Sequence, residues 1–67
     1  MPIIQVQMLT GRSPEKKQQL IAEVSKCVAG VLEIPIERVR VVITEVPPEH
    51  WGVGGQSIAQ QRKGEQQ

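Results

Sequence analysis

The sequence predicts a small α/β fold: a βαβ unit with parallel strands, followed by a short C-terminal β-hairpin. Residues 2–9 alternate between two faces as a strand does, residues 14–33 carry a helical apolar stripe, and residues 38–46 alternate again. A strand, a long helix and a second strand in succession form a right-handed crossover between parallel strands. We expect one domain, residues 1–67, whose polar end at 62–67 is frayed.

The first strand, residues 2–9, is rich in β-branched side chains. The alternation of its side chains places Ile4, Val6 and Met8 on one face. Proline is tolerated at the first residue of a strand, because its missing N–H breaks few ladder bonds there. Removal of Met1 would have a second consequence, since it would turn the ring nitrogen of Pro2 into a free secondary amine. The strand would then begin with a base on a rigid element.

The helix is expected to begin at Pro14 and to end near Glu33. Ser13 is suited to cap its N-terminus, and a proline fits the first helical position. Pro35 disfavours helical backbone at the residue before it. The apolar positions form one broad stripe, made of Leu20, Ile21, Val24, Cys27, Val28, Val31 and Leu32. Cys27, in the middle of this stripe, is expected to be an inert buried thiol.

The second strand is expected at residues 38–46, where Arg38, Arg40 and Val42 share one face. Three glycines after Trp51 indicate a tight turn or a short hairpin. Two strands and one helix leave one sheet face and the sheet edges uncovered. A chain of 67 residues is also marginally stable alone, and one cysteine with one histidine offers neither a disulfide nor a zinc cluster. We therefore expect a homo-oligomer.

The composition argues against two classes of partner. Eight basic and seven acidic side chains give a net charge of +1, whereas a nucleic-acid-binding domain is clearly basic. The chain has no apolar run of 18 residues, so no membrane span is expected. Its start lacks the features of a signal peptide, and the expected location is the cytoplasm.

Several side chains could carry chemistry, and each also has a structural interpretation. Pro2 could act as a general base if apolar burial and nearby cations lower the pKa of its amine. Arg12, in the turn before the helix, is a solvated loop residue or a carboxylate ligand. A straight strand would carry it away from Pro2, so a shared site would form across subunits or around the strand end. Arg38 and Arg40 form an outward polar face or an anion-binding surface, and Trp51 is a core residue or a pocket wall.

Two segments of the chain, MPIIQVQMLTGRSPEKKQQLI and RVRVVITEVPPEHWGVGG, resemble the 4-oxalocrotonate tautomerase family. The resemblance runs from Pro2 to about Arg62. It is specific because a Met-Pro start, GRS before the helix, VRV in the second strand and an aromatic-glycine segment occur together. The family implies a βαβ subunit with a C-terminal hairpin, assembled as a hexamer that is a trimer of dimers. It also suggests a role in the degradation of aromatic compounds.

The resemblance implies roles for individual residues. Pro2 would be the catalytic base, and Arg40, reaching in from a neighbouring subunit, would polarise the 2-oxo group of the substrate. Arg12 would bind the distant carboxylate. The pocket would be lined by Trp51, where the family often has Phe, and by Leu9.

The implied activity is that of an isomerase without metal or organic cofactor. It would convert 2-hydroxymuconate-type dienol dicarboxylates to unsaturated 2-oxo diacids by proton transfer through Pro2. Arg38 is a further candidate substrate ligand, at a position where some family members have a small polar residue. One alternative is a related proline-dependent dehalogenase, hydratase or decarboxylase, for which Glu45 and Glu49 are the available water-activating carboxylates. Another alternative is a non-catalytic oligomeric module.

Overall fold

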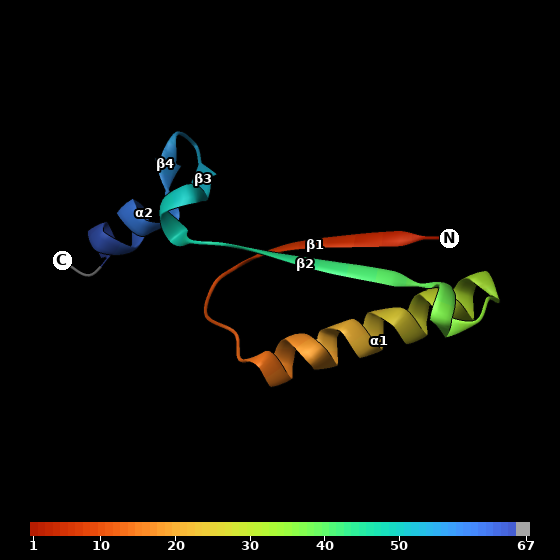
Figure 1. Cartoon of the computed structure of the whole chain (residues 1–67). Helices are drawn as coiled ribbons and strands as arrows, with labels where there is room; N and C mark the ends of the chain where they lie inside the picture. Colours follow the sequence, from red (N-terminus) through yellow and green to blue (C-terminus); the bar gives the residue numbers. More distant parts are fainter. Residues whose placement is uncertain (66–67) are drawn as a thin grey trace.

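The computed structural model describes residues 1–65 and confirms the βαβ unit (Figure 1). The unit consists of β1 (Ile3–Leu9), α1 (Pro14–Leu32), the 3-10 helix η1 (Ile36–Arg38) and β2 (Arg40–Val46). The chain continues with the 3-10 helix η2 (Pro48–His50), β3 (Gly52–Val53), β4 (Gln56–Ser57) and α2 (Ile58–Glu65).

The sheet of the βαβ unit has two parallel strands, β1 and β2, in a register that pairs Ile3 with Arg40 and Leu9 with Val46. Along β1, half-buried side chains alternate with exposed ones, as the sequence predicts. Ile4, Val6 and Met8 are half-buried, and so is Leu9 at the end of the strand. In Figure 1, α1 runs along one side of the pair of strands β1 and β2.

The predicted limits of α1 are confirmed. The Ser13 hydroxyl accepts a hydrogen bond from the backbone N–H of Lys16 at 3.2 Å, and Pro14 is the first helical residue. Glu33 ends the helix in the left-handed conformation, with φ of 56°, and its N–H reaches the carbonyl of Ala29. The boundary chemistry in the sequence was therefore sufficient to set both ends.

The prediction that Arg38 lies on the second strand is wrong. Arg38 ends η1, and β2 begins two residues later at Arg40. Pro35 starts this turn: its carbonyl accepts from the Arg38 N–H at 3.0 Å, and that of Ile36 accepts from Val39 at 3.0 Å. These local bonds compete with strand pairing, so the two arginines do not share one strand face.

The C-terminal hairpin, β3 and β4, is confirmed, whereas α2 was not predicted. Ser57 caps α2 by accepting from the Gln60 N–H at 3.1 Å, and Gln61 donates to the Val53 carbonyl at 3.2 Å. The helix is polar on most sides, so its sequence carries little periodic signal. α2 includes residues 62–65 of the expected frayed tail, whose fraying stays a prediction, and residues 66–67 lie outside the described part.

The chain is elongated and has a small core. Its radius of gyration is 15.8 Å, whereas a compact domain of this length has about 11 Å. Among residues 1–63, whose burial is described, Val39 is the one hydrophobic residue with less than 9% exposure. Cys27, expected to be buried, is exposed because the two-stranded sheet is too narrow to cover the whole apolar stripe of α1. The uncovered apolar surface is consistent with the expected oligomer.

Candidate active site

Pro2 lies directly before β1, half-buried at one end of the two-stranded sheet. Its carbonyl accepts a hydrogen bond from the backbone N–H of Arg40 at 3.1 Å, which ties the two chain segments together. Beside Pro2 is an open cavity of about 380 Å³ between β1 and α1. The other residues that line the cavity are Ile3, Ile4, Cys27, Val28, Val31 and Leu32. A base at this position would be surrounded by apolar side chains.

The backbone of Arg40 lies next to Pro2, but its side chain is held by another residue. Its Nη1 donates to the Glu37 carbonyl at 2.7 Å, so the guanidinium is held by the η1 turn of the same chain. Arg40 pairs with Ile3 in the sheet, and both are exposed. Because neighbouring residues on a strand point to opposite faces, this face is not the one that carries Ile4. Arg38, also exposed, lies at the same end of the sheet.

The other candidate residues lie at the opposite end of the sheet. Leu9 is the last residue of β1, and Arg12 is exposed in the loop that follows. β1 has seven residues, which at about 3.3 Å per residue separate Pro2 from Leu9 by about 23 Å. The strand continues without a break, so it does not curl the loop back toward Pro2.

Trp51 is half-buried at this second end, directly after η2. It lines a shallow cavity of about 230 Å³ whose other lining residues are Gln7, Val46, His50 and Gly52. The backbone carbonyl of Trp51 accepts from the Ile58 N–H at 2.8 Å, so α2 helps to fix the segment that carries the ring. The sequence did not predict Gln7 and His50 as cavity residues, because their spacing does not show that they line the same cavity.

The candidate residues of a single chain therefore fall into two groups, here called half-sites. The first, at the start of β1, contains Pro2, Arg40 and Arg38. The second, at the end of β1, contains Leu9, Arg12 and Trp51. The structure brings the members of each half-site to one end of the sheet and keeps the two half-sites apart.

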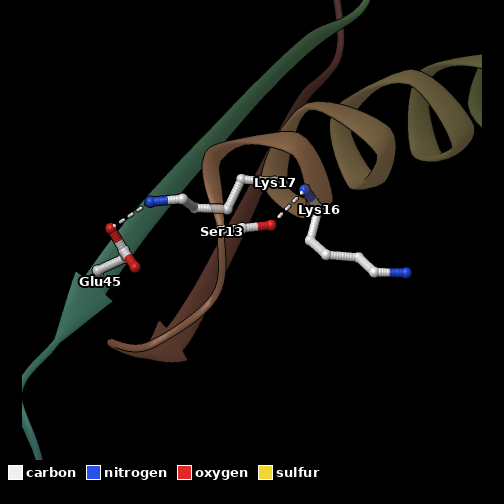
Figure 2. Close-up of polar contacts among 4 residues, drawn as sticks. All are labelled: Ser13, Lys16, Lys17 and Glu45. Carbon is white, nitrogen blue, oxygen red and sulfur yellow. Dashed lines mark hydrogen bonds and ion pairs between the residues drawn. The ribbon is translucent and has the colours of Figure 1, made fainter.

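One feature of the second half-site is an ion pair that the sequence analysis missed. Lys17 Nζ donates to Glu45 Oε1 at 2.8 Å, linking α1 to β2 (Figure 2). The partners are 28 residues apart, so only the folded chain brings them together. Glu45 is thus already paired with a cation, whereas Glu49 is exposed in η2.

Residues 1–65 offer neither a metal-binding cluster nor a membrane-spanning helix. No group of three or more His, Cys, Asp or Glu side chains in this part of the chain is arranged to hold a metal ion. Neither described helix combines the length and apolar character needed to cross a membrane.

Comparison with known proteins gives consistent matches. The family model described as "Tautomerase enzyme" matches residues 2–61. The chain is 55% identical to a 2-hydroxymuconate tautomerase of Pseudomonas putida over 56 residues, which are 84% of this chain and 89% of that protein.

Two solved structures also resemble the chain. TomN, a 4-oxalocrotonate tautomerase homologue in the tomaymycin biosynthetic pathway, is 42% identical with a TM-score of 0.89, over 92% of this chain and 95% of that one. A heterohexamer 4-oxalocrotonate tautomerase from Chloroflexus aurantiacus J-10-fl is 44% identical with a TM-score of 0.84, over 88% of this chain and 95% of that one.

Proposed function

This chain belongs to the tautomerase family and is a keto–enol isomerase, and on that premise we propose that it acts on 2-hydroxymuconate-type dienol dicarboxylates. The product is the unsaturated 2-oxo diacid, and the reaction uses no metal or organic cofactor. The observation that carries the proposal is the environment of Pro2, half-buried beside an apolar cavity at the start of β1. Met1 is 81% exposed, which leaves it accessible to the aminopeptidase that would free the ring nitrogen of Pro2.

In the proposed reaction, neutral Pro2 removes the proton from the 2-hydroxyl group of the substrate. The guanidinium of Arg40 stabilises the negative charge that develops on this oxygen. Arg12 binds the distant carboxylate through its planar fork, and Leu9 and Trp51 keep the pocket apolar. Protonated Pro2 then delivers its proton to carbon 5, so the base is regenerated in each turnover. Proton transfer by a positioned group contributes about 10²–10⁴-fold to the rate.

The proposed site is shared between copies of the chain. β1 pairs with β2 along one edge only, so its other edge is free to pair with a second β1. An antiparallel pairing about a two-fold axis would bring Pro2 of one copy to the Leu9 end of the other. Arg40 would come from an adjacent subunit, in agreement with its exposure and its tie to Glu37. The assembly we propose is a hexamer, a trimer of such dimers, as the heterohexameric relative suggests.

The position of Arg38 supports a smaller role in substrate binding. It is exposed at the end of η1, two residues from Arg40. We propose that it adds to the positive field that attracts the dianionic substrate, without contacting the reacting oxygen.

Hydration or dehalogenation through Pro2 would require a carboxylate that activates water. Glu45 is paired with Lys17 at 2.8 Å, and Glu49 lines neither of the two cavities, which favours the tautomerase reaction over these alternatives. The rate on 2-hydroxymuconate should therefore exceed the rate on 3-haloacrylates by orders of magnitude. Faster turnover of a 3-haloacrylate would contradict the proposed substrate.

Covalent labelling tests the proposed base. Intact mass should first show that Met1 is absent from the active protein. Bromopyruvate should then alkylate the Pro2 amine and abolish activity in a Cys27→Ala variant, from which the exposed thiol that lines the same cavity has been removed. An unlabelled and fully active protein after this treatment would show that Pro2 is not the base.

A further inference from the structure

The loop that carries Arg12, residues 10–13, is held at both ends by hydrogen bonds. Gly11 has φ of 127°, a conformation that side-chain-bearing residues rarely adopt, so the chain turns sharply directly before Arg12. At the start of the loop, the Thr10 N–H donates to the carbonyl of Val46 at 3.1 Å. At its end, Ser13 caps α1. The loop, which connects β1 to α1, is therefore held at its start by the last residue of β2 and at its end by the first turn of α1.

Lys17 connects the helical end of this loop to the same part of β2. Its backbone N–H donates to the Ser13 carbonyl at 3.1 Å, and its Nζ donates to Glu45 Oε1 at 2.8 Å (Figure 2). Glu45 directly precedes Val46, which holds the other end of the loop. Both ends of the segment around Arg12 are thus anchored to two consecutive residues of β2.

We propose that the Lys17–Glu45 ion pair is a positioning device for Arg12. It fixes the first turn of α1 against the end of β2, and so fixes the point from which the Arg12 guanidinium reaches the substrate. Bidentate binding of a carboxylate requires a defined position of the planar fork, and a misplacement of about 1 Å is costly. The inference rests on the proposed function, in which Arg12 binds the distant carboxylate.

The surroundings of the pair indicate a local effect. The exposed fraction of the side chain is 26% for Lys17 and 30% for Glu45. Ion pairs that are this accessible contribute little to global stability, so their loss leaves a chain folded. What changes is the freedom of the segment that the pair holds. Lys17 and Glu45 therefore act on substrate binding through Arg12, without touching the substrate.

The chain offers a matched control in the adjacent residue. Lys16 carries the same charge in the same helical turn, but its side chain points away from Glu45 (Figure 2). Substitution of its side chain keeps the backbone N–H that Ser13 caps. We expect Lys17→Gln to raise KM for 2-hydroxymuconate about twofold to fivefold with little change in kcat, and Lys16→Gln to change neither.

Two further comparisons separate positioning of Arg12 from a general structural effect. With an enol substrate that lacks the distant carboxylate, Lys17→Gln should have the same KM as the unmodified chain. Lys17→Arg, which keeps the charge, should restore most of the affinity for the diacid, and Glu45→Gln should reproduce the effect of Lys17→Gln. An equal rise of KM on both substrates, or an equal effect of Lys16→Gln, would overturn the inference.

A measurement without substrate keeps this inference separate from the proposed function. Backbone ¹⁵N order parameters of Gly11 and Arg12 should fall in Lys17→Gln but not in Lys16→Gln. Unchanged order parameters in Lys17→Gln would overturn the inference. If the unmodified protein fails to turn over 2-hydroxymuconate while the order parameters still fall, the proposed substrate is wrong and the positioning of the loop stands.

Discussion

At the Pro2 end of the sheet the chain exposes apolar side chains, whereas at the Leu9 end it ties its own elements together. Among the residues whose burial is described, five large exposed hydrophobic residues lie at or near the first end, Met1 (81%), Ile3 (64%), Val31 (76%), Leu32 (53%) and Ile36 (42%), against Val53 (53%) near the second. At the second end, hydrogen bonds and an ion pair join β1, α1 and β2. The first end presents more apolar surface that another molecule could cover, while the second has more side-chain and loop contacts between its own elements.

This difference matches the two tasks in the proposed reaction. A proline base works near neutral pH only in surroundings that lower the pKa of its amine, and apolar cover supplied by another subunit would do so. A carboxylate-binding arginine works best on a rigid loop, which its own chain can supply. The two ends are about 23 Å apart along β1, so a site that uses both Pro2 and Arg12 would have to combine different ends of different copies.

The strongest test of the Pro2 end is removal of the pyrrolidine ring that holds the amine in place. Pro2→Ala leaves a primary amine that has a different basicity and position. We expect kcat on 2-hydroxymuconate to fall by about 10²–10⁴-fold, because positioned proton transfer is lost. Steady-state rates on protein of verified intact mass measure this. A loss below tenfold would mean that another group removes the proton.

Arg40→Ala should have the next largest effect. Loss of the charge that stabilises the developing oxyanion is expected to reduce kcat by about 10²–10³-fold. The far-ultraviolet circular dichroism spectrum should be unchanged, since Arg40 is exposed and its side-chain bond is to a local carbonyl. A change in KM alone would assign Arg40 to binding and not to the chemical step.

Arg12→Ala tests the Leu9 end. Arg12 is expected to contact only the distant carboxylate, which does not change during the reaction. We therefore expect KM for the diacid to rise about 10- to 100-fold, with kcat changed by less than about threefold. Equal losses in kcat and in kcat/KM would show that Arg12 acts on the transition state instead.

Mixing two impaired variants tests whether the ends are combined across copies. If Pro2 of one copy works with Arg12 of another, subunits of Pro2→Ala and Arg12→Ala that assemble at random restore about one site in four. At substrate concentrations well below KM, activity should rise several-fold above that of either variant alone. Activity equal to the average of the two parents, in samples with verified subunit exchange, would show that each site lies within one chain.

Arg38→Gln should have the smallest effect. Arg38 is exposed in η1 and lies off the face of β2, so its contribution is long-range attraction. We expect KM to rise less than about threefold at low salt, and the difference should vanish at 0.5 M salt because exposed charges are screened over a few ångströms there. A large fall in kcat would place Arg38 at the reacting oxygen.

The sequence predicted those parts of the fold that depend on local chemistry. Ser13 and Pro14 set the start of α1, and the alternation of side chains located β1 and its buried face. The arginine at position 38 was misassigned because alternation alone does not reveal a 3-10 turn after a proline. α2 was missed because it is polar on most sides and begins with a cap, Ser57, inside what looks like a turn.

The candidate site was predictable as a set of residues but not as an arrangement. The Met-Pro start, GRS before the helix, VRV and the aromatic-glycine segment together pointed to the family, and with it to the residues proposed for catalysis. The sequence could not show that Arg40 is held by the Glu37 carbonyl. It also could not show that Lys17 meets Glu45, because the two are 28 residues apart.

The sequence by itself determined the order of the elements, the limits of α1 and the identity of the chemical groups, because caps, prolines and periodicity act between near neighbours in the chain. Only the tertiary structure decided which groups lie together at each end of the sheet. The parallel register of β1 and β2 fixes that partition: it sets Pro2 beside Arg40 and holds Arg12 a full strand length away.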